Sequence, residues 1–458
     1  MSQQIPPALL ESLQNVDGFD EKAFLAIHQS GEQITSVRLN PLKFDGGHSS
    51  FCINRKVPWS TNGFYLTQRP SFTSDPLFHA GAYYVQEASS MFLEEVVKQT
   101  CDLSMPLKIL DLCAAPGGKT TLMQSLISAE SLLVSNEVIK TRVNILSENC
   151  TKWGGANVVV TNNDPKDFQR LPGFFDVIVV GAPCSGSGLF RKDPGAIDEW
   201  SINNVALCSQ RQKRILSDIL PSLKPGGIII YSTCSYSTAE DEAICDWLSG
   251  FSKEITGLSL QLNNEWNIVE TTSPVHKVCG YRFYPDKLIG EGFFIAAFKK
   301  ENTAPGIKEI RPKNKPPMAS KPEMEVIQPM IKNAGIFSFF KWQDDVIAVP
   351  ACLLNYVFIL QSVLYLKKAG VSIGKIIRNE LIPDHAFALS NLVAENVVAV
   401  EADLATALQY LRRNDIDVQT NYKGWALIKY NSAALGWIKV LPSRINNYYP
   451  KEWRILNR

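Results

Sequence analysis

Short apolar runs alternate with amphipathic stretches along the middle of the chain, from about residue 105 to residue 300. Val, Ile and Leu run together in these segments without polar alternation, as in strands that are covered on both faces. The predicted strands are Lys108–Leu112, Leu132–Ser135, Val158–Thr161, Val177–Val180 and Ile228–Tyr231, with Gly292–Lys299 as a closing edge strand. Helical patterns lie between them. The alternation predicts βαβ units and a mostly parallel, doubly wound sheet, so the fold class is α/β.

The residues before this region have the pattern of a small α/β unit. Leu9–Ile27 has helical spacing, and residues 35–44 alternate like a strand, which places Arg38 on its polar face. Gly81–Val97 is predicted to begin a helix that leads into the central region.

Residues 301–329 contain six prolines among interspersed lysines, a composition that favours an extended linker. Beyond them, short apolar runs with corners at Gly424-Trp425 and Gly436-Trp437 predict one or two small mixed units that end in a β-rich module. The most membrane-like segment, Val346–Leu366, is interrupted by polar residues and a proline, so we expect a buried strand and helix rather than a membrane span. The predicted organisation is therefore 1–75, 76–300, 301–329 and 330–458.

Composition and charge narrow the class of protein. A chain of 458 residues that is 45% hydrophobic and 20% charged is typical of a soluble globular protein of about three domains. Because the net charge is only +1, any binding to nucleic acid has to come from local patches. The amino terminus lacks the pattern of a secretory signal. The ten cysteines include no C-x-x-C pair, so we expect no metal site and a reducing, cytoplasmic location.

Two cysteines follow predicted strands of the central sheet. Cys184 lies in the loop after Val177–Val180, and Cys234 ends the run that begins at Gly226. Ligands bind at the carboxyl edge of open α/β sheets, so both cysteines could face one crevice. The alternative is a pair of buried structural thiols.

A glycine-rich turn follows the first predicted strand of the sheet, in the sequence DLCAAPGGKTT. The turn lacks the first glycine of a P-loop, whose position holds Cys113, and the dinucleotide pattern G-x-G-x-x-G is also absent. With a P-loop and a dinucleotide site excluded, the remaining ligand for this turn is an adenosine-type cofactor without a transferable phosphate. Glu137, after the next strand, could accept the ribose hydroxyls, and Asp164, after the third, could accept from an adenine amino group. This combination indicates S-adenosylmethionine, although a single acid at a strand end is more often a cap or turn residue.

Several motifs together resemble those of the Sun-type RNA cytosine-5 methyltransferases: DLCAAPGGKT, NEVIKTR, APCSGSG, RKDP, STCSYS and GYRFYP with GFF. The similarity extends to SVRLNPLK and Pro58-Trp59 near the amino terminus, and to residues 383–390 and the GW…NYYP ending near the other end. It therefore covers nearly the whole chain. The resemblance implies a Rossmann-like S-adenosylmethionine methyltransferase core, a small α/β amino-terminal RNA-binding domain and a carboxyl-terminal PUA-like RNA-binding region.

The resemblance also implies roles for individual residues. Cys234 would be the nucleophile that adds to C6 of cytosine, and Cys184 would assist product release. Lowering the pKa of the nucleophilic thiol requires an electropositive pocket, for which Lys119, Arg191 and Lys192 are candidates. The implied cofactor-binding residues are Cys113, Ala114, Ala115, Pro116, Gly117, Gly118, Lys119, Glu137 and Asp164, with Gly181 at a position next to the cofactor and the target base.

One position departs from the family pattern. The family usually has D-A-P-C before the first cysteine, whereas this chain has Gly181 in place of the acid. Asp176 lies five residues earlier, at the opposite end of the predicted strand, and cannot replace it. Loss of a buried charge-assisted hydrogen bond costs roughly 1.5–3 kcal/mol, so we expect impaired activity.

The carboxyl-terminal tail interleaves basic and aromatic residues from Leu435 to Arg454, which fits either RNA stacking or the core of a small barrel. His385 is predicted to be structural. The leading hypothesis is S-adenosylmethionine-dependent methylation of cytosine C5 in 16S ribosomal RNA by a monomer that binds the small ribosomal subunit. The alternatives are an RNA-binding ribosome-assembly factor with impaired catalysis, and the same reaction on transfer RNA.

Overall fold

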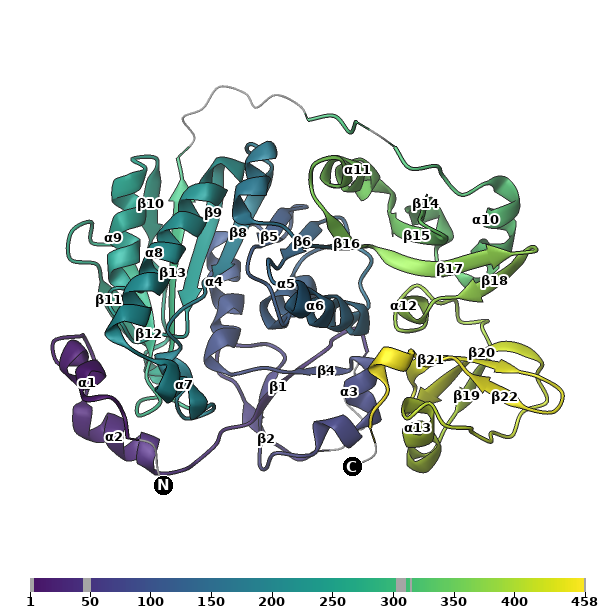
Figure 1. The fold of residues 1–458 in the computed structure, drawn as a ribbon, viewed down its shortest axis with the longest axis horizontal. Coiled ribbons are helices and arrows are strands. Elements are labelled where there is room, and N and C mark those ends of the chain that lie inside the picture. Colours follow the sequence, from purple (N-terminus) through teal and green to yellow (C-terminus); the bar gives the residue numbers. More distant parts are fainter. Residues whose placement is uncertain (1–3, 44–50, 302–309, 314, 457–458) are drawn as a thin grey trace.

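The computed structural model describes residues 4–43, 51–301, 310–313 and 315–456. Five parallel strands form its centre, in the order β7-β6-β5-β8-β9, and β13 closes them in antiparallel orientation. These strands are β5 Lys108–Asp111, β6 Leu132–Asn136, β7 Val158–Thr161, β8 Phe175–Gly181, β9 Leu223–Thr233 and β13 Phe293–Lys300. All six predicted strands are confirmed. The strand order reverses beside β5, so the ligand crevice of this sheet opens where β5 and β8 end (Figure 1).

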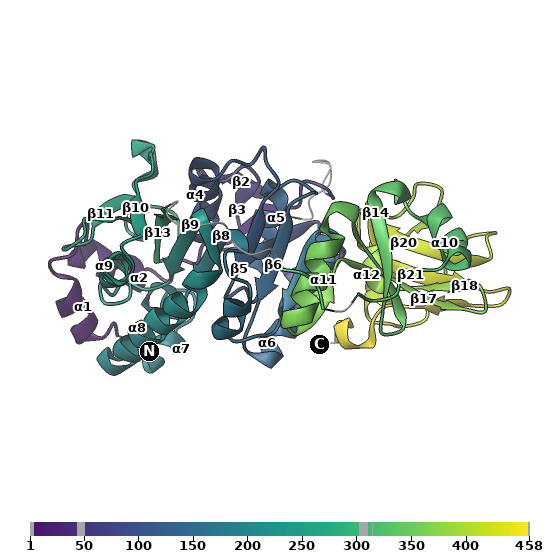
Figure 2. The same cartoon turned by 90° about the horizontal axis from the view of Figure 1, so that it is seen from above.

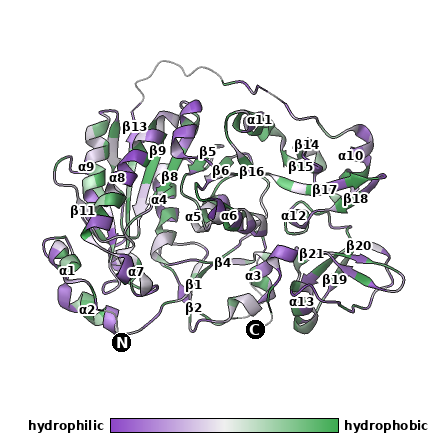
Figure 3. Ribbon diagram, viewed as in Figure 1, coloured by the Kyte–Doolittle hydropathy of each residue, from purple (hydrophilic) through white to green (hydrophobic). Residues whose placement is uncertain are grey.

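Helices cover both faces of this sheet because its strands are apolar on both faces (Figure 3). Along β5, Ile109 packs into the layer of helices α4 to α6 and Leu110 packs into the opposite layer. The first layer contains α4 Leu93–Thr100, α5 Gly118–Leu126 and α6 Lys140–Trp153; the second contains α8 Ile202–Ile219, α9 Glu242–Phe251 and α11 Leu354–Val363. The short helix α7, Gly195–Glu199, lies before α8.

Further strands extend the sheet at both edges to ten strands. On the β13 side these are β10 Ile255–Leu258, β11 Val269–Thr272 and β12 Cys279–Phe283. On the other side, β16 (Leu366–Ala369) pairs antiparallel with β7. Because β16 comes from the region predicted to form a separate carboxyl-terminal unit, that region is joined to the central sheet by strand pairing.

The most membrane-like segment forms β15 Asp345–Pro350, helix α11 and the start of β16, as expected from its polar interruptions. In the described ranges no helix has both the length and the apolar character that a membrane crossing would need.

The described part of the amino-terminal unit contains three short helices and a four-stranded sheet. The helical pattern of Leu9–Ile27 is divided between α1 Pro7–Leu13 and α2 Glu21–Gln29, because Gly18 turns the chain with φ +75°. The sheet has the order β2-β3-β1-β4, with β2 Ile53–Lys56, β3 Gly63–Leu66, β1 Ser36–Leu39 and β4 Tyr83–Val85, and α3 Pro76–Ala80 precedes β4. The helix predicted from Gly81 was wrong at its start, since β4 and a 3₁₀ turn precede α4. Phe44, the last residue of the predicted strand, lies outside the described residues.

Arg38 corrects the prediction of a polar strand face. Its side chain is 1% exposed and lies over the Trp153 ring, 4.5 Å from the ring centre. Its guanidinium donates to the Thr121 hydroxyl at 2.5 Å and to the Gln86 side-chain carbonyl at 2.9 Å. Alternation placed the residue on the face away from the local core, but that face packs against α5 and α6. The amino-terminal unit therefore braces the first turn of α5.

Two four-stranded sheets form the carboxyl-terminal region, beside the central sheet (Figure 2). The first contains β14 Phe337–Trp342, β15, β17 Val371–Ile377 and β18 Glu380–Pro383; the second contains β19 Ala399–Glu401, β20 Gly424–Tyr430, β21 Ala433–Val440 and β22 Ile445–Asn447. Helices α12 His385–Ala388 and α13 Leu404–Leu411 pack with them. Part of the predicted linker is helical, as α10 Lys321–Ile327, because Ser320 and Glu323 cap its first turn. Pro305 of that linker lies outside the described residues.

One hydrophobic core joins the two ends of the chain. Leu77 and Tyr83 of the amino-terminal unit pack with Tyr410 of α13, Leu435 of β21 and Tyr449 after β22. Helix α3 lies beside β21 and the chain end (Figure 1). The first and last units are therefore one packed body.

We expect the packing between the first and last units to become less stable in acid. Burial lowers the pKa of His79 to about 4 and that of His385 to about 3, so both rings are neutral in the folded protein. In the unfolded chain they take up protons below about pH 6.5, so their contribution to stability is complete above that pH and falls as the pH falls. At pH 5 the loss is about 2 kcal/mol for each ring. The free energy of unfolding in urea, compared between pH 7.5 and pH 5, measures this loss of stability.

The matched pair for this experiment is His385→Gln and His276→Gln. The exposed His276 lies in the central domain and outside this shared core, so its replacement controls for the substitution of a histidine as such. The first variant should reduce the stability difference between the two pH values, and an equal difference in both variants would contradict the expectation.

Candidate active site

Cys184 and Cys234 lie together at the carboxyl edge of the sheet. Cys184 follows β8 and Cys234 follows β9, and these strands are parallel neighbours in which Gly181 pairs with Ser232. Their sulfur atoms are 3.0 Å apart, and neither is part of a disulfide. The strand order therefore brings both cysteines to one crevice, as predicted. The two thiols are close enough to share a proton.

The two thiols differ in their affinity for that proton. The hydrogen bond from Cys184 lowers the pKa of Cys234, while the same bond, followed by burial, raises the pKa of Cys184 well above its usual range. The Lys119 ammonium adds a favourable charge at Cys234, and Glu240 opposes it. Of the two sulfur atoms, Cys234 is therefore the one at which a thiolate is favoured, with the Cys184 thiol as its hydrogen-bond donor.

Lys119 occupies the space that the absent acid would face. A Cβ atom built on Gly181 would lie 3.0 Å from Lys119 Nζ, and this ammonium also lies 5.7 Å from the centre of the Phe293 ring. Among the described residues it has neither an ion-pair nor a hydrogen-bond partner. Asp176 is at the other end of β8, where it accepts from Lys108 N at 2.8 Å and pairs with Lys224 at 2.6 Å. It leaves Lys119 unpaired.

The other predicted basic residues do not act on the thiols. The Arg191 side chain is 3% exposed, lies 3.7 Å from Glu291 and donates to the Glu32 carbonyl at 2.8 Å. Burial raises the pKa of Glu291 to about 7. Lys192 is exposed and lines a small cavity beside Glu291. Of the three candidates, only Lys119 contributes to the lowered pKa of Cys234.

The loop from Cys113 to Gly118 connects β5 to α5, and neighbouring side chains hold its backbone. Arg142 Nη2 donates to the Ala115 carbonyl at 2.6 Å, and Asn149 Nδ2 donates to the Pro116 carbonyl at 2.9 Å. The Ala115–Pro116 peptide is cis. Gly117 has φ +117°, a conformation that favours glycine, and it exposes the first amides of α5. Burial raises the pKa of the Cys113 thiol to about 12, so this sulfur stays neutral.

Three acids stand at successive strand ends around this loop. Asp111 is fully buried, its Oδ2 accepts from the Thr120 hydroxyl at 2.6 Å, and its Oδ1 has no partner among the described residues. Burial raises its pKa to about 6. Glu137 accepts from Ile139 N at 2.9 Å and lies 3.6 Å from Arg142.

Asp164 also serves as a structural cap. It caps the 3₁₀ helix Pro165–Arg170 through Lys166 N, and it lies 3.3 Å from Arg214. The less specific interpretation of this acid, a strand-end cap, thus describes its present contacts. Its side chain remains 41% exposed, so it is still open to a ligand at this edge.

Sequence reasoning missed four residues that build this site, namely Asp111, Arg142, Asn163 and Glu240. Asp111 and Arg142 lie inside the quoted motifs, so their position was a usable signal. Asn163 bonds both backbone groups of Tyr365, at 2.9 and 3.0 Å, which fixes β16 beside Asp164. Its partner lies two hundred residues away, and no local pattern indicates such a contact.

The whole chain matches one group of known proteins. Residues 101–299 match the family described as 16S rRNA methyltransferase RsmB/F, residues 5–88 the N-terminal domain of 16S rRNA methyltransferase RsmF, and residues 397–455 the methyltransferase RsmF PUA domain. The ribosomal RNA small subunit methyltransferase F of Aeromonas salmonicida is 31% identical over 441 residues, which cover 91% of this chain and 90% of that protein. This chain belongs to the methyltransferase F family.

Other members of the methyltransferase F family and solved structures agree with this assignment. The Vibrio parahaemolyticus relative is 29% identical over 98% of this chain and 97% of its own length. A methyltransferase homolog protein from Pyrococcus horikoshii is 28% identical with a TM-score of 0.52, and the match covers 65% of this chain and all of that one. The structure of NSun6 from the same organism with SFG is 19% identical over 64% of this chain and 98% of that one, with a TM-score of 0.53, and shows the shared fold.

The methyltransferase F assignment confirms the fold class predicted from the sequence. The protein is an RNA methyltransferase with a Rossmann-like core, an amino-terminal domain and a carboxyl-terminal PUA domain.

Proposed function

We propose that the protein methylates C5 of cytosine in small-subunit ribosomal RNA, with S-adenosylmethionine as methyl donor and Cys234 as covalent nucleophile. The observation that carries the proposal is the pair of sulfur atoms 3.0 Å apart, with the pKa of Cys234 lowered by the hydrogen bond from Cys184. A thiolate beside a proton-bearing thiol suits an addition that must later be reversed.

The loop and its acids fit S-adenosylmethionine. The buried Asp111 Oδ1 lacks a partner among the described residues, and no side chain caps the first amides of α5 at Gly117. Cys113 to Lys119 would hold the cofactor, Glu137 would accept its ribose hydroxyls and Asp164 its adenine amino group. When bound, the cofactor supplies an electrophilic methyl group.

The chain's own residues perform the remaining chemistry. Cytosine C5 is a weak nucleophile, and addition of the Cys234 thiolate to C6 makes it enamine-like. Once Cys234 is bonded to carbon, it no longer carries the charge that raises the pKa of Cys184. Cys184 can then lose its proton to solvent and, as a thiolate, take the C5 proton after C5 has been methylated. The C5–C6 double bond re-forms and Cys234 leaves as a thiolate.

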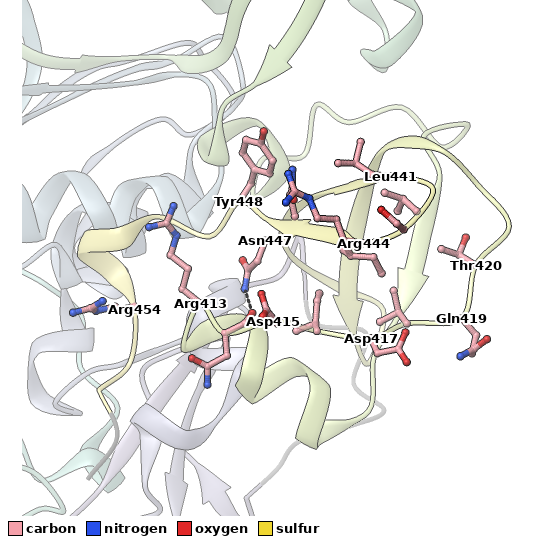
Figure 4. A pocket seen from close by; sticks show the side chains of 17 residues that line it. Arg413, Asp415, Asp417, Gln419, Thr420, Leu441, Arg444, Asn447, Tyr448 and Arg454 are labelled. Carbon is pink, nitrogen blue, oxygen red and sulfur yellow. Dashed lines mark hydrogen bonds between the residues drawn. The ribbon is translucent and has the colours of Figure 1, made fainter.

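The PUA domain offers a surface for RNA. Of the aromatic residues of the tail, Trp437 and Tyr449 are buried core residues, while Tyr448 is 40% exposed. Figure 4 shows Tyr448 beside Arg444 over a groove of about 1120 Å³, with Arg413 and Arg454 at one end. Among the described residues these arginines have no ion pair. Unpaired arginines beside an exposed ring suit phosphate contact and base stacking, which supports RNA as the partner.

A second candidate function rests on Gly181. Without the usual acid, the protein could act as an RNA-binding assembly factor whose catalysis is impaired. The same reaction on transfer RNA is a further alternative, because substrate choice depends on the flanking domains.

The test supplies labelled S-adenosylmethionine and three acceptors: small ribosomal subunits, free ribosomal RNA and transfer RNA. We expect label in 5-methylcytidine of ribosomal RNA, and bisulfite sequencing of ribosomal RNA from cells with and without the protein locates the nucleotide. Label in transfer RNA alone would contradict the substrate. Binding to small subunits without transfer of label would favour the assembly factor.

A further inference from the structure

One buried carboxylate joins the two cysteine loops. The Glu240 side chain is 0% exposed, and both of its oxygens accept hydrogen bonds. Oε1 accepts from Ser185 N at 2.8 Å and from Gln212 Nε2 at 3.2 Å. Oε2 accepts from the Ser185 hydroxyl at 2.5 Å and the Ser235 hydroxyl at 2.7 Å. Ser185 directly follows Cys184 and Ser235 directly follows Cys234, so a single side chain holds the residue after each thiol.

The other side-chain contacts between these loops near the serines are longer, since the Ser235 hydroxyl lies 3.4 Å from the hydroxyls of Ser185 and Ser187. Ser187 accepts from Tyr236 N at 2.9 Å, and Gly188 N donates to the Cys234 carbonyl at 2.9 Å. Both contacts cross between the loops farther from the serines, while Glu240 acts beside the sulfur atoms. Its main chain is fixed as well, because the Tyr231 hydroxyl donates to the Glu240 carbonyl at 2.6 Å.

The charge of Glu240 does not favour the nucleophile. A negative group near Cys234 and Cys184 disfavours a thiolate at either of them. The Glu240 side chain therefore contributes to the reaction through geometry and not through activation of the thiol.

We propose that Glu240 is a positioning residue that sets the distance between the two cysteine sulfurs by holding Ser185 and Ser235. This inference rests on the proposed function of the cysteines. It implies that loss of the carboxylate separates the two loops, so that Cys184 no longer donates to Cys234. A displacement of reacting groups by about 1 Å reduces rate on the order of 10²-fold.

The first variant is Glu240→Ala, measured as methyl transfer to small-subunit RNA. We expect kcat to fall on the order of 10²-fold, while the dissociation constant of S-adenosylmethionine stays within about twofold because the cofactor loop is untouched. The matched control is Glu242→Gln. Glu242 is a buried carboxylate two residues away that pairs with Arg282 at 2.5 Å, so its change should lower stability and leave kcat per folded molecule unchanged.

The second variant, Glu240→Gln, separates placement from charge. The Gln carbonyl can still accept from Ser185 N and Gln212, and its amide can donate to the two serine hydroxyls, which also accept. We expect kcat within about threefold of the wild type. Among the described residues, the titratable and charged groups that interact with Cys234 are Cys184, Lys119, Glu240 and Cys208. Because the Glu240 charge raises the pKa of Cys234, its removal in Glu240→Gln should move the acid limb of the pH–rate profile to lower pH.

Three results would overturn the inference. They are Glu240→Ala with kcat within threefold of the wild type, Glu240→Gln as slow as Glu240→Ala, and an unmoved acid limb. If Glu240→Ala does not fold, the double variant Ser185→Ala with Ser235→Ala keeps the carboxylate and removes its link, and should lose about tenfold in kcat. An unchanged rate there would also overturn it. Wild type that transfers no methyl group contradicts the proposed function instead.

Discussion

Cys234→Ala should abolish methyl transfer, with a loss on the order of 10⁴-fold or more in kcat, because it removes the thiolate that adds to C6 and activates C5. Cys184→Ala should behave differently. It retains a nucleophile but lacks the group that takes the C5 proton, so a covalent RNA–protein adduct should accumulate. Denaturing gel electrophoresis after incubation with RNA and S-adenosylmethionine detects this adduct as a slow band.

Cys352→Ala is the matched control, because Cys352 is exposed and lies in the carboxyl-terminal region. It should keep wild-type rate and form no stable adduct. The double variant of Cys184 and Cys234 should also form none. An adduct in Cys234→Ala, or its absence in Cys184→Ala when wild type is active, would reverse or remove the assigned roles.

Gly181→Asp should raise the rate of methyl transfer roughly ten- to a hundredfold, the equivalent of one restored charge-assisted hydrogen bond of about 1.5–3 kcal/mol. The structure leaves space for the change. The nearest atom to the new Cβ is Lys119 Nζ at 3.0 Å, which is the free end of a flexible side chain. A carboxylate there can pair with Lys119 and face the crevice. Rates under saturating cofactor and RNA measure the effect.

The same substitution should change the pH dependence. Lys119 helps to lower the pKa of Cys234, and a carboxylate at position 181 offsets part of its charge. The acid limb of the pH–rate profile should therefore move to higher pH, even as the maximum rate increases. Gly181→Asn tests shape without charge and should show neither effect. A rate for Gly181→Asp equal to that of wild type would remove the argument that the missing acid impairs this protein.

Local sequence patterns were enough to predict the central sheet. Val158–Thr161 was predicted with its observed ends, because four consecutive apolar or β-branched residues between polar turns favour a short buried strand over other elements. The pairing of Cys184 with Cys234 followed from topology alone, since both end neighbouring parallel strands. The loop proposed to hold the cofactor could be selected from the sequence because Pro116, Gly117 and Gly118 are consecutive.

Contacts between distant parts of the chain could not be predicted in this way. The pattern placed Arg38 on a polar face, because the helix that buries it begins some eighty residues later. Strand β16 has only four residues and acquires its partner from another domain. Glu240 lies in an acidic segment that resembles a solvated turn, and only the fold brings its carboxylate between two serines.

The core shared by the first and last units bears on how the protein is made. Leu77 and Tyr83 leave the ribosome long before their partners Leu435 and Tyr449, which follow more than 300 residues later in the chain. Domains usually fold from the amino terminus as they emerge. Here the apolar face of the first unit stays uncovered until Leu435 and Tyr449 have been made, so we expect chaperones to bind the nascent chain in that interval. For the same reason, a stop codon shortly before Tyr449 should damage the beginning of the protein as well as its end.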